Sequence, residues 1–400
     1  MKRVGYLYEK MEDKSLIKQV IMKGAKGKKK RWDVKEVMAD VDGYTEKIYD
    51  LVVTKSYVPT KPRRKLIHDA SSCKERTISI VPYYPDGIMH QLVTEVIRPI
   101  LMKNMYYWSC ASIPGRGNAH AIRYMKRSMR NVRGTKYTAK LDIHHYYQNI
   151  NIDILMGKLE RKIKDRDMLK LIRDIVDSDT EEGLSIGFYI NQWLANFYLQ
   201  DIDRMILNLD GVSYYVRQMD DLVLMGPNKR KMHRAVNAIK ENLNNMGLSL
   251  NHSWQVFRTD SRGVDFVGYR FFHNHVILRR RNLLRLKRQA LRISKGCIVT
   301  PHVAAGMISR AGQLAHCNGT SIRQRYIDPI KIKKLKTIVK TGNSRILGGD
   351  SLLKNAIVID ANEIKKLLAE KFHVPETNII KSQYSYTVII EDATKEEKNS

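Results

Sequence analysis

One segment decides the fold prediction for this chain: Tyr214-Tyr215-Val216-Arg217-Gln218-Met219-Asp220-Asp221-Leu222-Val223-Leu224-Met225-Gly226. Two adjacent acids lie between two apolar runs, a pattern that predicts two strands joined by a tight turn. Carboxylates held at such a turn can bind divalent metal ions beside a phosphate group. An Asp-Asp pair alone carries little information, so the prediction depends on the apolar flanks and on a matching acid upstream.

That matching acid is Asp142, in the run Ala139-Lys140-Leu141-Asp142-Ile143-His144-His145-Tyr146-Tyr147. The apolar residues before it predict a strand over 137–143 that ends at the acid. The two segments therefore supply three candidate catalytic acids, Asp142, Asp220 and Asp221. The alternative is that all three are solvated turn residues.

The charge of the chain favours a nucleic-acid partner. Lys and Arg number 71 against 41 Asp and Glu, which gives a formal net charge of +30 and a pI near 9.8. Basic proteins bind nucleic acids largely because phosphate neutralisation releases counterions. Binding to an anionic membrane surface is the alternative, but the charge recurs along the whole chain and does not form one juxtamembrane cluster.

Length and cysteine content narrow the class of protein further. At 400 residues the chain should hold two or three domains. The four cysteines are far apart and form no CxxC pair, which argues against a zinc ribbon and a disulfide scaffold: Cys73, Cys110, Cys297 and Cys317. The N-terminus has no apolar leader and no stretch approaches 18 apolar residues, so we expect a cytoplasmic, soluble protein without a membrane partner.

Basic segments flank the candidate acids on both sides. Gly115-Arg116-Gly117 precedes a predicted helix and is a weak signal for a phosphate cradle. Residues 23–31 form a basic loop that either orders on a polyanion or stays a solvated surface loop. A predicted amphipathic helix over 279–294 carries a polycationic face with these residues: Arg279, Arg280, Arg281, Arg285, Lys287, Arg288 and Arg292. A solvated charged helix is the alternative reading.

Taken in their order along the chain, the segments described above and those that follow resemble the bacterial and phage reverse transcriptases. The resemblance covers residues 55–335. The related lineages are those of diversity-generating retroelements, group II introns and defence systems. Four segments carry the resemblance: Asp142 followed by two aromatic residues, residues 183–199, the hairpin around Asp220-Asp221, and Phe266-Val267-Gly268-Tyr269, which we expect to be one strand over 264–271.

The resemblance implies an α+β right-hand polymerase fold of fingers, palm and thumb. We expect N-terminal helices and fingers over 1–136, and a palm over 137–278 with a helical insertion at about 151–180. The thumb would cover 279–345. Gly348-Gly349 reads as a linker, followed by a small C-terminal α/β appendage of unknown role over 350–400.

The resemblance also implies the chemistry of the site. Asp142 and Asp220 would bridge two Mg²⁺ ions, with Mn²⁺ as a substitute, and Asp221 and the carbonyl of Ile143 would complete the metal site. Lys74 and Arg76 would grip the incoming triphosphate. Further residues would line the nucleotide site: Tyr147 as a steric gate against a ribose 2′-hydroxyl, Ile186, Gly187 at a close approach to the template-primer, and Gln192. A core tyrosine is the alternative for Tyr147.

Arg116, Gln218 and the cations of the 279–294 helix would contact nucleic acid, the helix by shape and phosphate contacts. The sequence departs from the family at several positions. Gln218 stands where Tyr is usual, Ser185 where Pro is usual and Asn191 where Ser is usual. A lysine that relatives often carry near 248–254 is missing, and His252 is a weak candidate to replace it as a general acid.

We therefore predict an RNA-directed DNA polymerase that extends a primer with dNTPs on an RNA template. Its partners would be RNA, a DNA product or primer, a cognate non-coding RNA and an accessory protein. The system would be a retroelement or a phage-defence system. The main alternative is a maturase-like RNA-binding protein with an idle polymerase site, and an RNA-dependent RNA polymerase is a weaker one.

Overall fold

The computed structural model describes residues 3–69, 74–179 and 182–347, and a few short stretches between 366 and 388. It divides into two compact units, residues 1–277 and 278–400. Among the described residues, no helix is long and apolar enough to cross a membrane.

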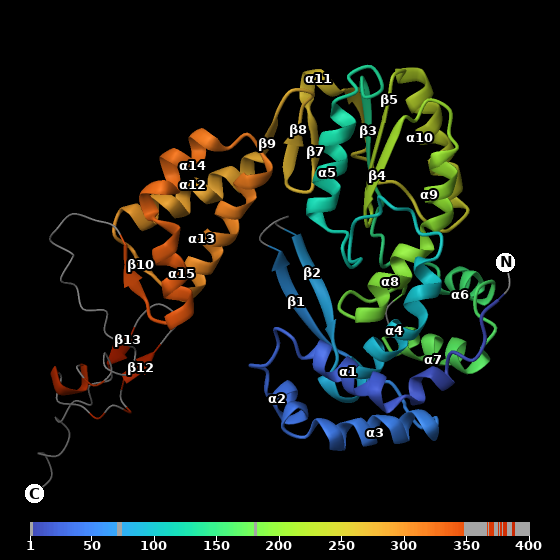
Figure 1. Ribbon diagram of the computed structural model, residues 1–400, viewed down its shortest axis with the longest axis horizontal. Coiled ribbons are helices and arrows are strands. Elements are labelled where there is room, and N and C mark those ends of the chain that lie inside the picture. The colour runs from blue at the N-terminus through green and yellow to red at the C-terminus, as the bar shows by residue number, and fades with distance from the viewer. Residues whose placement is uncertain are drawn as a thin grey trace, which may run out of the picture. The chain divides into compact units, whose positions relative to one another are not determined.

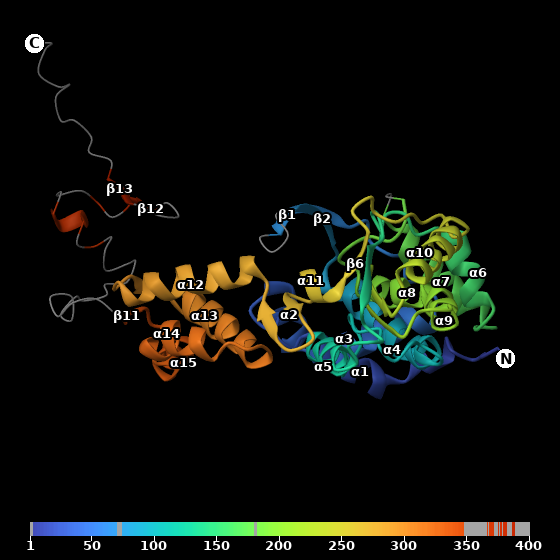
Figure 2. The ribbon, with the colours of Figure 1, turned by 90° about the horizontal axis from the view of Figure 1, so that it is seen from above.

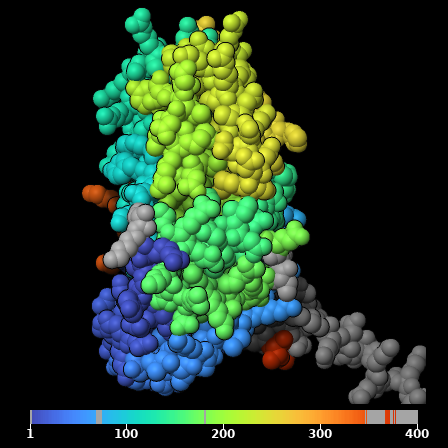
Figure 3. All heavy atoms as spheres, turned by 90° about the vertical axis from the view of Figure 1, so that its right-hand side faces the viewer, coloured from blue at the N-terminus to red at the C-terminus, as the bar shows by residue number. Residues whose placement is uncertain are grey.

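The first unit begins with helices that pack around a shared apolar core (Figure 1). Asp13 and Asp40 fix the starts of two of them, because their side chains accept backbone N–H groups of the first turn. On the face shown in Figure 3, these N-terminal helices adjoin the segment around α6 and α7. The helices of this part are α1 (Lys14–Gly24), α2 (Trp32–Ala39), α3 (Val41–Val53), α4 (Ile88–Met102), α6 (Ile152–Glu160) and α7 (Arg166–Asp177).

An antiparallel hairpin follows the first three helices. It consists of β1 (Arg63–Asp69) and β2 (Lys74–Ile80), paired from Arg63↔Ile80 to Asp69↔Lys74. Most of its described side chains are exposed, so its apolar contacts are few. The hairpin meets the rest of the unit at the end of β2, where Ser79 is buried and its N–H donates to the carbonyl of Ile186 (N···O 2.8 Å).

A four-stranded antiparallel sheet forms the second half of the unit, in the order β4-β5-β3-β6. Its strands are β3 (Tyr137–Asp142), β4 (Tyr214–Gln218), β5 (Asp221–Gly226) and β6 (Gln255–Arg258). Helix α10 packs against β3, β5 and β6, and α5 packs against β4 (Figure 1). The other helices of this part are α5 (Asn118–Met129), α8 (Tyr189–Tyr198), α9 (Gln200–Leu207), α10 (Lys229–Asn244) and α11 (Thr259–Arg262).

The single strand expected over 264–271 is wrong. The segment is a hairpin of β7 (Val264–Phe266) and β8 (Tyr269–Phe271), and β9 (Val276–Leu278) extends its small sheet. Val267 and Gly268 at the turn have φ values of 42° and 89°, the paired positive values that tight hairpins favour. The chain therefore reverses where the apolar pattern alone suggested that it continued.

The second unit contains a helical bundle (Figure 2). Its elements are α12 (Arg280–Ser294), α13 (Pro301–Gln313), α14 (Thr320–Tyr326), α15 (Ile332–Thr341), and the strands β10 (Ile298–Val299) and β11 (Arg345–Ile346). Helix α13 starts at Pro301, where the lost N–H costs nothing, and Thr300 caps it. The predicted linker Gly348-Gly349 and most of the predicted α/β appendage lie outside the described residues. Of that region, β12 (Ile379–Lys381) and β13 (Tyr386–Val388) pair in antiparallel fashion.

Candidate active site

The fold brings the three candidate acids together at one end of the sheet. Asp142, the last residue of β3, is the register partner of Asp221, the first residue of β5. Asp220 lies in the turn between β4 and β5, and its carbonyl oxygen accepts the N–H of Ile143 (N···O 3.2 Å). Met219 completes the turn with a φ of 58°. Segments almost 80 residues apart in the chain are thus joined by strand pairing at the acids themselves.

Two neighbouring side chains already contact these half-buried acids. The side-chain amide of Asn251 donates to Asp142 (Nδ2···Oδ2 3.3 Å), and its backbone N–H donates to the Asp142 carbonyl (2.7 Å). The ammonium of Lys140 lies 3.7 Å from Asp221 Oδ2. His252, by contrast, is exposed to solvent.

The chemistry of these acids fits a magnesium site. Carboxylate and carbonyl oxygens are the ligands that Mg²⁺ prefers. Among the described residues, no three His, Cys, Asp or Glu side chains could hold a metal ion as they stand. Binding would therefore require the carboxylates to turn toward a common point, and the metal site stays a prediction.

A buried polar network beside the β4–β5 turn was not predicted from the sequence. The guanidinium of Arg217, fully buried, forms a bidentate ion pair with Asp203 of α9 (Nη2···Oδ2 2.6 Å, Nε···Oδ1 2.8 Å). It also donates to the Met219 carbonyl in the turn (Nη1···O 3.1 Å). Burial acts to lower the pKa of Arg217, but the Asp203 carboxylate raises it above its ordinary value. Arg217 therefore stays charged and braces the turn that holds Asp220.

Tyr147 lies close to this turn. Its hydroxyl donates to the sulfur of Met219 (Oη···Sδ 3.7 Å) and its side chain is half-buried. Burial raises the pKa of the Tyr147 phenol, and the nearby charge of Asp220 raises it further. Its neighbour Tyr146 is the core residue of the pair, fully buried and bonded to the Ala195 carbonyl (2.5 Å).

The unusual residues Ser185 and Asn191 belong to a second buried network. Ser185 donates to the carboxylate of Asp179 (Oγ···Oδ2 2.7 Å), and Asn191 donates to the Ser185 carbonyl (Nδ2···O 3.0 Å). Arg64 of β1 and Ser79 of β2 also donate to Asp179. Burial acts to raise the pKa of Asp179, but these hydrogen bonds lower it below its ordinary value. The network anchors the β1–β2 hairpin to the loop before α8.

Gly187 has a structural role that its predicted binding role did not include. Its φ of 127° is one that other residues avoid, and a Cβ there would lie 2.1 Å from the Ser79 carbonyl oxygen. The close approach seen in the structure is therefore to β2 of the same chain. Ile186 is half-buried, and its carbonyl oxygen accepts the N–H of Ser79 in β2. Gln192 is exposed on α8.

The remaining predicted contacts are spread around the site. Arg76 is exposed on β2, and the Lys74 side chain lies outside the described residues. Arg116 donates to the Tyr106 carbonyl (Nη1···O 3.0 Å) and lies over the Tyr107 ring. Gln218 is half-buried and donates to Asn118 at the start of α5 (Nε2···Oδ1 3.3 Å). Both Arg116 and Gln218 therefore tie the segment before α5 to its surroundings.

Helix α12 presents the predicted polycationic surface. Arg279 precedes its first turn, and Arg280, Arg281, Arg288 and Arg292 are exposed. Arg285 and Lys287 are half-buried, and the Lys287 ammonium lies over the Tyr326 ring (5.2 Å to the ring centre). The opposite face buries Leu286, Ala290 and Ile293 against the other helices of the bundle.

The family model described as reverse transcriptase (RNA-dependent DNA polymerase) matches residues 67–271, just over half of the chain and all of the residues that build the acid site. This chain belongs to the reverse transcriptase family. Membership confirms the predicted resemblance and, together with the mixed helices and sheets, the α+β right-hand fold class.

Two relatives are similar to part of this chain. It is 26% identical over 215 residues to the group II intron-encoded protein LtrA of Lactococcus lactis subsp. cremoris, covering 50% of this chain and 35% of the relative. It is 27% identical over 122 residues to the uncharacterized mitochondrial protein ymf11 of Marchantia polymorpha, covering 30% and 16%. The chain spans about a third of the length of LtrA.

Among the solved structures that match part of this chain is telomerase from Candida albicans in complex with a fragment of telomeric RNA. That structure is 15% identical, has a TM-score of 0.44, and the match covers 80% of this chain and 63% of the telomerase chain. Apo telomerase from Candida tropicalis matches with a TM-score of 0.43 and 12% identity over 79% of this chain and 67% of the other.

Proposed function

We propose that this protein is an RNA-directed DNA polymerase that extends a primer with dNTPs on an RNA template. The observation that carries the proposal is the pairing of Asp142 with Asp221 beside the Asp220 turn. Strand pairing fixes these acids with little freedom, and phosphoryl transfer depends mainly on positioning and charge stabilisation. Membership of the reverse transcriptase family supports the same activity.

In this proposal Asp142, Asp220 and Asp221, with the carbonyl of Ile143, hold two Mg²⁺ ions. Bound there, the ions would activate the primer 3′-hydroxyl and neutralise the triphosphate and the leaving pyrophosphate. The protein's part is to keep the acids in place. Arg217 does so from behind the turn, and Asn251 orients Asp142 from the side.

The nucleotide site extends from the acids toward the β1–β2 hairpin. Tyr147, next to Met219 and Asp220, would exclude a ribose 2′-hydroxyl and so select dNTPs. Arg76 and Lys74 on β2 would bind the triphosphate, where the arginine fork matches phosphate geometry. Ile186, Gly187 and Gln192 would form the wall of the site between β2 and α8.

The proposed domains follow from the resemblance to reverse transcriptases. Residues 1–136 would be N-terminal helices and fingers, 137–278 the palm, 279–345 the thumb and 350–400 an appendage. The thumb cations of α12, together with Arg116 and Gln218, would contact the template-primer duplex. A cognate non-coding RNA, an accessory protein, and a retroelement or phage-defence setting complete the proposal.

Primer extension on an RNA template with Mg²⁺ and dNTPs tests this function. Wild-type protein should extend the primer, and the Asp220→Ala, Asp221→Ala double variant should not. Equal extension by both proteins would contradict the site. Tyr147→Ala should extend with rNTPs better than wild type does, whereas Tyr146→Phe, which keeps the buried ring, should not.

A maturase-like RNA-binding protein with an idle site is the second candidate. The similarity to a group II intron-encoded protein and the departure at Gln218 favour it. Two results together would support this candidate instead. The wild type would not extend a primer even when it is purified with its own RNA, and the double variant would bind RNA tightly.

A further inference from the structure

Lys140 connects two parts of the molecule that the proposed function does not join. It lies on β3, two residues before Asp142, so both side chains point to the same face of the sheet. Its ammonium donates to the backbone carbonyl of Asp265 in β7 (Nζ···O 2.6 Å) and lies 3.7 Å from Asp221 Oδ2. One lysine thus contacts both an acid of the candidate site and the β7–β8 hairpin.

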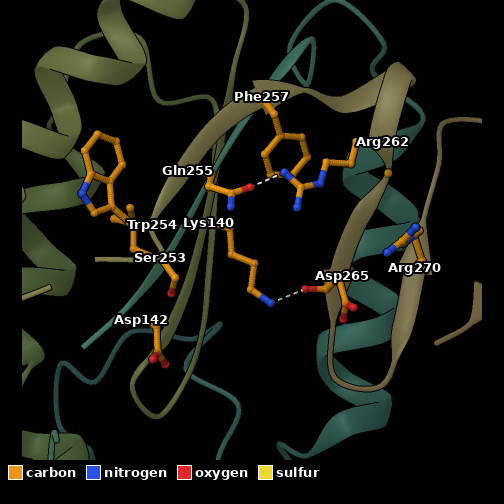
Figure 4. A pocket seen from close by; sticks show the side chains of 11 residues that line it. Lys140, Asp142, Ser253, Trp254, Gln255, Phe257, Arg262, Asp265 and Arg270 are labelled. Carbon is orange, nitrogen blue, oxygen red and sulfur yellow. Dashed lines mark hydrogen bonds between the residues drawn. The ribbon is translucent and has the colours of Figure 1, made fainter. Parts of the chain in front are cut away.

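Figure 4 shows the pocket in which this contact lies. Lys140 extends from the sheet across the pocket to Asp265, while Asp142 lies at its lower edge. Arg262 and Arg270 also line the pocket, and Arg262 is held by Gln255 and lies over the Phe257 ring. The lysine therefore spans the space between β3 and β7.

We propose that Lys140 is a positioning residue that anchors the β7–β8 hairpin to the catalytic strand and weakens the attraction of Asp221 for a divalent cation. This inference rests on the proposed function, because it concerns the same acids.

The geometry explains how one lysine can serve both purposes. An ammonium has three donors and no acceptor, and the bond to the Asp265 carbonyl holds the Lys140 ammonium beside β7. That bond keeps the charge too far from Asp221 for a direct hydrogen bond but near enough to act on it electrostatically. Lys140 thus reduces repulsion among the acids in the metal-free protein, and opposes a cation that binds to them.

Two measurements on the metal-free protein test the proposal without requiring polymerase activity. The hydrogen-exchange rate of the amides in residues 264–271 measures how firmly the β7–β8 hairpin is held. A Mn²⁺ titration followed by electron paramagnetic resonance measures the affinity of the acids for a divalent cation. Lys140→Met keeps the apolar stem and removes both contacts. Lys140→Arg keeps the charge, and Lys136→Met, at an exposed position just before β3, is the matched control.

Loss of one charged hydrogen bond should make exchange in the hairpin about fivefold faster in Lys140→Met. Loss of a partly screened positive charge should tighten Mn²⁺ binding about threefold. Lys140→Arg should bind Mn²⁺ as wild type does, and Lys136→Met should match wild type in both measurements. Should Lys140→Met fail to fold, Lys140→Leu, which also lacks a donor and a charge, replaces it with the same expectations.

An unchanged exchange rate or an unchanged Mn²⁺ affinity in the Lys140 variant would overturn the proposal. Absence of Mn²⁺ binding by the wild type would contradict the proposed function itself, and the exchange comparison would then still test the anchor. Primer extension by the wild type establishes the polymerase independently, so the two failures are distinguishable.

Discussion

The β4–β5 turn and helix α12 use charge in opposite ways. At the turn, the acids are held by strand pairing and are braced from behind by Arg217 and Asp203, both almost fully buried. On α12, most of the cations are exposed, and Leu286, Ala290 and Ile293 are buried against the bundle. The contrast suggests that the turn is built to fix a few atoms in place, and the helix to follow a charged backbone of variable sequence.

The largest effect should come from the acids at the turn. Asp142→Ala should reduce primer extension by on the order of a thousandfold or more, because lost metal-ion catalysis is worth several kcal/mol. Single-turnover extension rates measure this change. The control is Asp210→Ala, an exposed acid paired with Lys231, which should extend like wild type. A comparable loss in the control would mean that overall charge, and not the site, governs the rate.

Removing the buried Arg217–Asp203 ion pair should lower the folding stability. Arg217→Met leaves the Asp203 charge buried without its partner, and such losses cost about 3–5 kcal/mol. Urea unfolding measures the difference, and adding Asp203→Leu should recover part of it. The exposed pair Arg258–Asp260 gives the matched control, since solvent screens this pair and Arg258→Met should change the stability far less. Equal costs at the two sites would contradict the contrast drawn above.

A buried histidine should make the first unit sensitive to acid. Burial lowers the pKa of His90 to about 4, while the unfolded chain titrates near the ordinary value of 6.5. Below pH 6.5 the unfolded state therefore binds a proton that the folded state excludes. Folding stability should fall by about 3 kcal/mol between pH 6.5 and pH 4 from this residue alone.

Urea unfolding at several pH values measures this effect, and His90→Leu should flatten the curve in that window. The variant keeps an apolar side chain near the Phe188 ring, which His90 contacts in the native protein. The same slope in wild type and variant would show that other groups cause the acid sensitivity.

The smallest effects should come from single cations of α12. Arg288→Gln should change folding stability by no more than about 0.5 kcal/mol, because the side chain is exposed. It should weaken binding to an RNA–DNA duplex equally for all sequences and reduce the slope of log K against log salt by about 1. A salt titration by fluorescence anisotropy measures the slope. An unchanged slope would remove Arg288 from the nucleic-acid surface.

The strands and the turn that carry the three acids could be predicted because their sequence signals are local. The strand ending at Asp142 and the turn at Asp220-Asp221 each follow from apolar runs that end in an acid, and β3 and β5 formed as expected. The hairpin at 264–271 was missed because the Val267-Gly268 turn interrupts a pattern that also fits one strand.

Long-range polar networks could not be predicted from the sequence. In the alternating pattern of strand β4, Arg217 has the position of a surface residue. Nothing in the nearby sequence indicates that Asp203 of helix α9 neutralises its charge. The same holds for Ser185 and Asn191, whose departures from the family pattern are explained by Asp179 and its hydrogen bonds to the β1–β2 hairpin. The Lys140 bond to Asp265 depends on the hairpin turn that the sequence did not reveal.

Crystals of the protein with an RNA template, a chain-terminated primer, the next dNTP and Mn²⁺ would test the central claim most directly. The anomalous signal of manganese locates the ions without assumptions about activity. We predict anomalous density within coordination distance of Asp142 and Asp220, beside the triphosphate of the dNTP. Anomalous density elsewhere, beyond coordination distance of both carboxylates, would contradict the assignment of the active site.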